Sequence, residues 1–580
     1  MRETAKLLIE RLGLIGTARH VRRLLPGWRR RQAGLRTAHA AFLDGAEARL
    51  KAEIGDLPVS RRALVVGFDN PQMAGLQLPL ILALRLAGFH TTVLLPFAHD
   101  ASADFYRAIG ANAIAETETL APPLNRAAVR RLCAAATDPE SVLALEYRGV
   151  AIGRFVASTA MRRYRVGNVD PRAPGMREAV AERIAASVAA TDIAHAAIAE
   201  TAPELVCFYD RGYTPDGELF EAALATGARS TTLNAAHKSG FLISKRYDLA
   251  NKHRHFGAPS AATWAALQRM DWTDAHWRAL RAEVEGAYRA GTWFDEVGTQ
   301  VDKRVLTGPE LIRDLGLDPA RKTAVVFPHM FWDATFFWGV DLFDDYRDWF
   351  CRVLQAAAAN EGMNWIVKIH PANLVKNARD GIAGEASEVV AAREVLGKLP
   401  DHIKLLPPDS PVSTLSLYDV MDVCLTVRGT VGLEAAMFGI PVLTAGTGRY
   451  DGFGFTIDSR SREEYLARLA DIHTIAPPDA RATETARRYC YGMFVTRPLE
   501  TTTLRFRYAR DAAASLELSL DLPDDRALAD CPDIARLADW LASDDEDLHG
   551  MEIETAPAAP AVAPEPPRAA AAAPERQALT

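Results

Sequence analysis

Residues 423–442 read VCLTVRGTVGLEAAMFGIPV, a pattern that predicts a buried strand, a tight turn and a helix. Gly429 and Thr430 stand at the start of that helix, where unpaired N–H groups and the helix dipole can hold a phosphate. Arg428 adds a guanidinium suited to phosphate, and Glu434, one turn further on, could accept hydrogen bonds from ribose hydroxyls. In the alternative, Thr430 only caps the helix and Glu434 is solvated. The flanking glycines and the Gly-Ile-Pro return favour a ligand site.

Two further strand ends carry polar side chains. Residues 364–371 read NWIVKIHP, with Lys368 and His370 at the end of a buried run. A lysine in a buried strand is costly unless it meets an anion. His329 follows the strand at 323–327 among aromatic residues, where a base could stack or a phosphate could approach. A satisfied structural histidine is the alternative, but the Lys-x-His-Pro grouping favours ligand contact.

The first half of the chain offers candidate proton acceptors. Asp210 follows the strand predicted at 205–209, and its carboxylate could take a proton from an acceptor hydroxyl. His237 follows the next strand and is the competing base, with Lys238 beside it as a candidate for acidic groups of donor or acceptor. In the alternative, Asp210 pairs with Arg211 or caps the next helix. The sequence leaves these choices open.

Short apolar runs that alternate with helical segments position these residues. Such alternation predicts parallel strands covered by helices on both faces, and therefore an α/β protein. It occurs at 61–255 and again at 316–475, with a less regular connection at 256–315. Ligands bind outside the carboxyl ends of strands in such sheets, so we expect two Rossmann-like, doubly wound domains that face a cleft.

The two ends of the chain differ from these domains. Residues 1–60 predict a basic helical extension, and the arginines between Arg19 and Arg31 could lie on an anionic membrane surface. The alternative is a solvated helix packed against the main body. Residues 476–550 predict C-terminal helices, near 479–490 and 499–518. The tail at 551–580 is rich in Ala and Pro and predicts disorder.

Composition limits the class of protein. The 580 residues are 49% hydrophobic and 24% charged with a net charge of −7, which favours a multidomain enzyme over a nucleic-acid binder. The six cysteines form no CxxC pair, no run reaches the roughly 20 apolar residues of a membrane span, and no secretory signal is visible. We expect a cytoplasmic protein without a metal site.

A set of short motifs carries a family resemblance. They are IVKIHP at 366–371, DS at 409–410, RGTVGLE at 428–434 and GIPV at 439–442, with DRGY at 210–213 and NAAHK at 234–238 in the first half. Together they resemble bacterial capsular and surface polysaccharide glycosyltransferases of the two-Rossmann, GT-B type. The closest likeness is to capsule enzymes that include transferases of Kdo (3-deoxy-manno-octulosonic acid). It covers roughly residues 60–475.

The resemblance implies transfer of a sugar from a nucleotide-activated donor, CMP-Kdo among the candidates, to a hydroxyl of a capsular or surface glycan or glycolipid. It implies a donor site formed by His329, Lys368, His370, Asp409, Ser410, Arg428, Gly429, Thr430 and Glu434. Asp210 or His237 would be the catalytic base, and Arg211 and Lys238 would bind the acceptor. It implies no cofactor and no essential metal. A capsule assembly complex is an expected partner, at the inner membrane if the protein is peripheral there.

Three other functions fit parts of the pattern. A CDP-polyol or CDP-glycerol phosphotransferase of the teichoic-acid type resembles the chain in its GT-B architecture and motifs, and would form a phosphodiester. A nucleotide-sugar epimerase would change the donor without any acceptor. A non-catalytic GT-B-like subunit of a capsule assembly complex would have no need for Lys368, His370 and Glu434 together.

Overall fold

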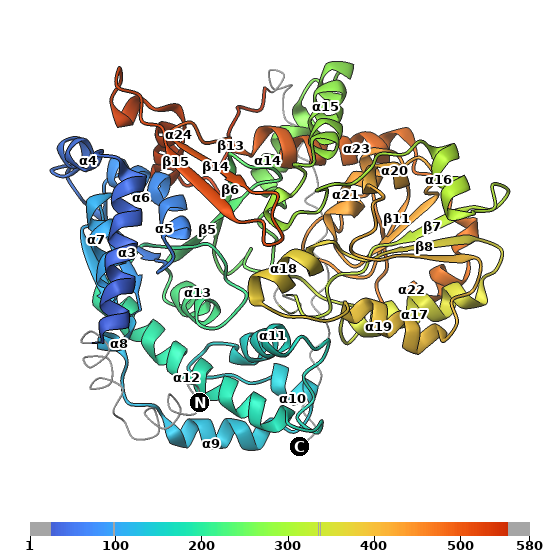
Figure 1. Cartoon of the computed structure of the whole chain (residues 1–580), viewed down its shortest axis with the longest axis horizontal. Helices are drawn as coiled ribbons and strands as arrows, with labels where there is room; N and C mark the ends of the chain where they lie inside the picture. Colours follow the sequence, from blue (N-terminus) through green and yellow to red (C-terminus); the bar gives the residue numbers. More distant parts are fainter. Residues whose placement is uncertain (1–24, 97–98, 334–335, 337, 555–580) are drawn as a thin grey trace.

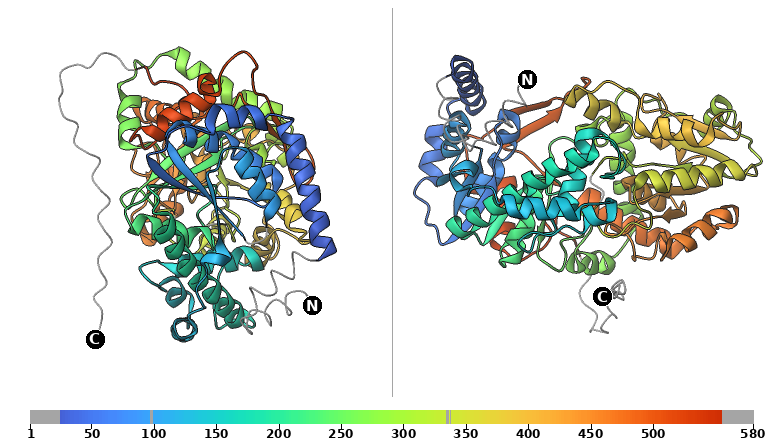
Figure 2. Two further views of the ribbon diagram at one scale, coloured as in Figure 1. Left: turned by 90° about the vertical axis from the view of Figure 1, so that its left-hand side faces the viewer. Right: turned by 90° about the horizontal axis from the view of Figure 1, so that it is seen from below.

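The computed structural model describes residues 25–96, 99–333, 336 and 338–554. Two sheets with mainly parallel strands dominate it, one in each half of the chain, and helices cover both faces of each sheet (Figure 1). Seen from below, the two halves lie side by side as separate lobes (Figure 2). The α/β class and the two doubly wound halves predicted from the sequence are confirmed.

The N-terminal sheet has seven strands in the order β13-β6-β5-β4-β1-β2-β3. Their bounds are β1 (Arg61–Val66), β2 (Phe89–Leu95), β3 (Ala113–Glu116), β4 (Leu205–Phe208), β5 (Arg229–Ala235), β6 (Phe241–Tyr247) and β13 (Leu499–Glu500). Strands β1 to β5 run parallel, whereas β6 and β13 pair antiparallel. The order reverses between β1 and β4, and Asp210 follows β4, so this residue stands where doubly wound sheets bind ligands.

The helices of this half form layers on either face of the sheet. They are α5 (Pro71–Leu76), α6 (Leu78–Leu86), α7 (Asp100–Ala108), α8 (Thr117–Leu120), α9 (Arg126–Ala135), α10 (Pro139–Leu143), α11 (Ile152–Tyr164), α12 (Met176–Thr201) and α13 (Asp216–Ala225). The long α12 packs against α9, α11 and α13. Helix α6 is apolar on all sides (LPLILALRL) and is almost entirely buried, because α24 (Pro532–Ala542) covers the side that the sheet does not.

The C-terminal sheet has six parallel strands in the order β12-β11-β10-β7-β8-β9. Their bounds are β7 (Thr323–Val326), β8 (Asn364–Lys368), β9 (Ile403–Leu406), β10 (Val423–Thr426), β11 (Val442–Thr444) and β12 (Ile457–Asp458). The helices are α16 (Gly308–Leu315), α17 (Tyr346–Ala359), α18 (Ala372–Asp380), α19 (Ser387–Leu396), α20 (Thr414–Leu417), α21 (Thr430–Met437), α22 (Arg462–Ala470) and α23 (Ala480–Tyr491). The order reverses between β7 and β10, so His329 and the turn at 427–430 meet at one edge.

The connection at 256–315 is more regular than the sequence predicted. It contains α14 (Ala261–Arg269), α15 (Asp274–Ala290) and the 3₁₀ turn η1 (Asp295–Val297), besides α16. Helix α15 begins with a capping box between Thr273 and His276 and packs on α23 of the C-terminal half. The loop after α15 therefore lies over the carboxyl edge of the second sheet.

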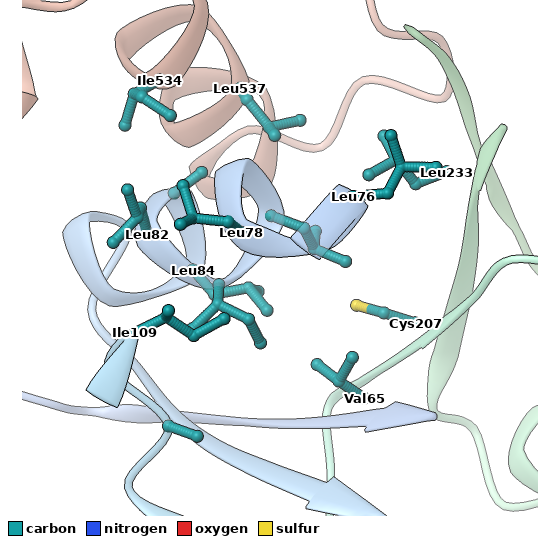
Figure 3. Packing of buried hydrophobic residues seen from close by; sticks show 14 of the residues in the cluster. Val65, Leu76, Leu78, Leu82, Leu84, Ile109, Cys207, Leu233, Ile534 and Leu537 are labelled. Atoms are coloured by element: carbon teal, nitrogen blue, oxygen red, sulfur yellow. The ribbon is translucent and has the colours of Figure 1, made fainter. Parts of the chain in front are cut away.

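The prediction of a helix at 499–518 is wrong. This stretch holds β13 and a hairpin of β14 (Leu504–Tyr508) and β15 (Leu516–Leu520), and α24 (Pro532–Ala542) follows. Leu504, Phe506 and Tyr508 alternate with exposed arginines, which is the period of a strand with one buried face. The chain thus returns to the first half, where Ile534 and Leu537 of α24 pack near α6 (Figure 3).

The N-terminal extension packs on the first half through α3 (Pro26–Leu43) and α4 (Glu47–Ile54). Trp28 and Leu43 are among the buried residues of α3, and Arg29, Arg30 and Arg31 are exposed on it. This arrangement fits the solvated helix of the sequence alternatives. The more N-terminal arginines of the basic run, and residues 555–580 of the tail, lie outside the described residues.

The returning segment is fixed by a buried ion cluster around Asp547. Its carboxylate is fully buried and pairs with Lys245 at 2.8 Å and with Arg497 at 3.0 Å, both also fully buried. We predict that Asp547→Ala lowers the free energy of unfolding by about 3–5 kcal/mol, because it removes the buried carboxylate that two buried cations share. Urea unfolding measures this. The control is Asp544→Ala, at an exposed ion pair with Arg229, where no measurable loss is expected. Equal losses would contradict the role of the cluster.

Candidate functional site

A pocket of about 230 Å³ lies at the carboxyl ends of β7, β8 and β10, next to the loop after α15. We call it the C-terminal pocket. Six of the nine predicted donor residues line it: His329, Lys368, His370, Gly429, Thr430 and Glu434. They come from different strand ends, so the parallel sheet brings together side chains that are up to about 100 residues apart in sequence.

One wall of the pocket is the start of α21. Gly429 is the N-cap and has no side chain to cap the first turn, and the amides of Thr430 and Val431 have no acceptor within the helix. Thr430 does not cap the helix either, because its hydroxyl oxygen accepts a hydrogen bond from Arg449 Nη2 at 2.7 Å. The helix therefore offers N–H groups and the positive end of its dipole to an anion.

The arginine that lines the pocket is Arg449, not Arg428. The buried Arg428 side chain forms an ion pair with Asp341 and does not line the pocket. Arg449 Nη1 donates to the Arg428 carbonyl at 3.3 Å, and its buried Nε has no hydrogen-bond partner among the described residues. Arg449 follows β11 in a Gly-Thr-Gly-Arg loop, and no motif had singled it out.

Lys368 is the unpaired cation of the pocket. It ends β8, is 3% exposed, and its Nζ has no hydrogen-bond partner in the part of the chain that the structure describes. Burial, together with the nearby charge of Lys303, lowers the pKa of Lys368 to about 7. An anion in the pocket would favour the charged form and raise this pKa again.

The two histidines of the pocket are held neutral. Burial and the charge of Arg428 lower the pKa of His329 to about 3, and its Nε2 accepts a hydrogen bond from the Arg428 amide at 3.2 Å. Burial and the charge of Lys376 lower the pKa of His370 to about 4, and its Nδ1 accepts from the Ala372 amide at 3.1 Å. Above pH 5 neither ring neutralises or adds to the charge of Lys368.

The Glu434 side chain is buried, with 2% of its surface exposed. Three donors from the protein form hydrogen bonds with its carboxylate. Oε2 accepts from Tyr288 Oη and from Tyr418 Oη, the latter at 2.7 Å, and Oε1 accepts from Trp293 Nε1 at 3.3 Å. Burial raises the pKa of Glu434, and these hydrogen bonds oppose the rise. The predicted solvated alternative is excluded by this burial.

Asp409 and Ser410 do not line the pocket. The Ser410 carbonyl instead accepts a hydrogen bond from Lys303 Nζ at 2.5 Å. The Asp409 carboxylate acts through its charge, which favours the protonated forms of Lys303 and Lys368. Their place is next to the unpaired lysine rather than against a ligand.

A second cavity of about 320 Å³ lies in the first half, where β4 gives way to α13. We call it the N-terminal pocket, and its lining residues are Thr159, Arg162, Asp210, Tyr213, Thr214 and Asp216. Asp210 is exposed, and its Oδ1 accepts from the amides of Arg211 and Gly212 at 2.6 and 2.9 Å. Burial, with the charge of Asp210 next in size, raises the pKa of Asp216 to about 8. A carboxylate and a protonated carboxyl can therefore share this pocket at neutral pH.

The other first-half candidates line neither pocket. His237 is buried and pairs through Nε2 with Glu283 at 2.7 Å, and Lys238 pairs with the same carboxylate at 2.6 Å. The Arg211 guanidinium stacks on the rings of Phe220, Tyr247 and Trp338, each 4.3 to 4.4 Å away. Packing and pairing account for the positions of all three side chains.

Asp333 lies between the two pockets. It follows β7 and accepts from Tyr213 Oη of the first half at 3.0 Å and from Lys376 Nζ of α18 at 2.8 Å. Burial, the largest single effect, opposes its charged form, but the charges and hydrogen bonds of Lys376, Arg162 and Tyr213 together lower the pKa of Asp333 to about 2. The negative charge of Asp333 favours the protonated forms of His329 and His370 in the C-terminal pocket and of Arg162 in the N-terminal pocket. The two pockets therefore lie on either side of this carboxylate.

Within the described ranges, no helix combines the length and the apolar character that a membrane crossing requires. The same residues contain no group of three or more His, Cys, Asp or Glu side chains placed to hold a metal ion.

Two doubly wound halves with a pocket at the carboxyl edge of the second define a GT-B-like fold. Residues 317–476 match the profile of a family described as capsule polysaccharide biosynthesis protein. The matched segment contains the HP and RGTVGLE motifs, and the match supports the resemblance that these motifs carry. The comparison with curated protein sequences gives no match.

Solved structures with similar folds include enzymes of two kinds. A UDP-GlcNAc 2-epimerase from Neisseria meningitidis, bound to UDP-GlcNAc, is 11% identical, with 75% of this chain and 96% of that chain covered and a TM-score of 0.24. The spinosyn rhamnosyltransferase SpnG is 13% identical, with 75% and 96% covered and a TM-score of 0.25. The glycosyltransferase SnogD from Streptomyces nogalater is 16% identical, with 75% and 95% covered and a TM-score of 0.21.

Substitution of Lys368, which is unpaired among the described residues, and of Lys376, which pairs with Asp333, should have opposite effects on the free energy of unfolding. Lys368→Met should raise the free energy of unfolding by about 1–3 kcal/mol at pH 7, because it removes a cation that is costly to bury. Since the folded pKa lies below that of the unfolded chain, this gain should shrink as pH rises from about 7 to 10.5. Lys376→Met should instead lower stability by about 2 kcal/mol, because it strips Asp333 of its partner. Urea unfolding at pH 7 and 10 measures both, and destabilisation by Lys368→Met would contradict the assignment.

Proposed function

We propose that this protein is a glycosyltransferase that moves a sugar from a nucleotide-activated donor to a hydroxyl of a capsular or surface glycan or glycolipid. The observation that carries the proposal is Lys368, a buried amine that has no partner among the described residues and lines a pocket at the start of α21. A buried cation next to free helix amides is suited to the phosphate of a nucleotide. The capsule polysaccharide family match of residues 317–476 supports the same class of reaction.

In this proposal the nucleotide occupies the C-terminal pocket. The phosphate lies against the Thr430 and Val431 amides, Arg449 and Lys368, and Glu434 accepts hydrogen bonds from ribose hydroxyls. The bond between the anomeric carbon and the phosphate oxygen breaks, and negative charge grows on the departing phosphate. Lys368 and Arg449 stabilise that charge in a site with little water, where such interactions are strong.

The acceptor hydroxyl enters from the N-terminal pocket. Its oxygen attacks the anomeric carbon, and its proton passes to the Asp210 carboxylate, the exposed carboxylate of that pocket. Asp210 is preferred over His237 because His237 is buried, bonded to Glu283 and outside both pockets. The products are a glycoside and a nucleoside phosphate.

A thermal-shift panel tests donor binding. Purified protein is measured with CMP, CDP, UDP, GDP and their sugars, with and without EDTA, and the nucleotide that stabilises it identifies the donor class. We predict that Lys368→Met weakens binding of that nucleotide by about tenfold or more, because a charge-assisted contact to phosphate is lost. The exposed Lys398→Met is the matched control and should bind like the wild type. If no nucleotide stabilises the wild type, the proposal fails and a non-catalytic subunit becomes the better account.

Product analysis then separates the enzyme classes. The protein is incubated with the donor so identified and with capsular oligosaccharides or glycolipids as acceptors. A glycoside without phosphorus supports the proposal. A phosphodiester would mean a polyol-phosphate transferase, and a changed donor in the absence of acceptor would mean an epimerase.

The choice of base gives a separate prediction. Asp210→Ala should lower turnover by about 10²–10⁴-fold, because the group that accepts the proton is lost, while the donor Kd should change by less than about twofold. Single-turnover rates and donor titrations measure the two effects. Wild-type turnover in Asp210→Ala, together with its loss in His237→Ala, would move the base to His237.

A further inference from the structure

We propose that Tyr288, Tyr418 and Trp293 are positioning residues that hold the Glu434 carboxylate for the hydroxyls of a bound ribonucleotide. The inference rests on the proposed function of the C-terminal pocket and extends it to residues outside its motifs. We call these three residues the carboxylate cage. Tyr288 and Trp293 come from the connecting region and Tyr418 from the end of α20, so the cage is assembled from two separate parts of the chain.

The cage leaves one acceptor position on Glu434. An ionised carboxylate has four lone-pair sites, two on each oxygen. Oε2 uses both of its sites on Tyr288 Oη and Tyr418 Oη, and Oε1 uses one of its two on Trp293 Nε1. Because Glu434 also lines the pocket, the remaining site on Oε1 is available to a ligand hydroxyl.

The cage also keeps its donors fixed in one protonation state. Burial, with the charge of Glu434 next in size, raises the pKa of Tyr288 and of Tyr418 well above the ordinary value. Both phenols therefore remain donors across the whole working range of pH. The indole N–H of Trp293 is a donor only, so every cage group supports the ionised form of Glu434.

Packing with the first half of the chain holds the cage in place. Trp293 stacks on Tyr288 with ring centroids 5.3 Å apart, and the His237 ring lies 5.3 Å from Trp293 on another side. The amide of Phe294, the next residue, donates to the His237 carbonyl at 2.7 Å. His237, with Glu283 as its partner, thus has a structural role behind the pocket wall.

Discrimination between ribose and deoxyribose tests the proposal. Isothermal titration calorimetry measures the tightest nucleotide among CMP, CDP, UDP and GDP, and its 2′-deoxy form, with wild type, Tyr288→Phe, Tyr418→Phe and Glu434→Gln. We expect the wild type to favour the ribonucleotide. Each variant should weaken ribonucleotide binding by about tenfold while the deoxy form changes less than about twofold, because the lost interaction reaches the ligand through its 2′-hydroxyl. The control Tyr465→Phe, at a buried tyrosine bonded to Trp349, should keep the wild-type ratio.

A purely structural role would weaken both nucleotides equally, and that result overturns the proposal. A second arm without ligand follows urea midpoints of Tyr418→Phe, Glu434→Gln and the double variant. We expect the urea midpoint of the double variant to shift no further than that of the more strongly affected single variant, because both changes break the same contact. Additive shifts would overturn the proposal even where ribonucleotide binding falls. If no nucleotide binds the wild type, it is the proposed function that fails, and the midpoints still decide whether the cage exists.

Discussion

The burial of a lysine amine that has no hydrogen-bond or ion-pair partner among the described residues is the constraint on which the C-terminal pocket depends. Lys368 ends a strand that is buried along its whole length, so its side chain cannot reach solvent as a surface lysine does. An unpaired buried cation costs several kcal/mol, and the surrounding groups do not offset that cost. The histidines are neutral, Arg449 adds positive charge, and Glu434 is the only acid among the described residues that line the pocket. A bound anionic ligand would supply the negative charge that balances Lys368 and Arg449.

The rest of the architecture holds this pocket rigid and places the second pocket beside it. The connection between the halves supplies Tyr288 and Trp293 of the pocket lining, and their hydrogen bonds to Glu434 link the connection to α21. The segment after α23 returns to the first sheet, where the buried ions around Asp547 secure it. Asp333, paired with Tyr213 and Lys376, then bridges the halves between the pockets. Transfer between two ligands needs such fixed relative positions.

Local sequence patterns predict the strands and the ends of strands well, because apolar runs and glycine turns are short-range features. The strand that ends at Lys368, the helix after Gly429 and the six predicted residues that line the C-terminal pocket follow from such patterns. Contacts made at long range were not predictable: Arg428 turns to Asp341, and Arg449 takes its place from a loop without a motif. The hairpin at 504–520 has the period of strands with one buried face, which the predicted helix at 499–518 did not take into account.

The central claim is that Lys368 meets the phosphate of a nucleotide, and proton uptake on binding tests it most directly. Calorimetry at pH 8 in two buffers of different ionisation enthalpy measures this uptake, with the phosphate already fully ionised. Because the pKa of Lys368 is about 7 in the empty pocket and should rise when an anion binds, uptake of about one proton is predicted. Lys368→Met should bind with no uptake. Tight binding by the wild type without proton uptake would contradict the account.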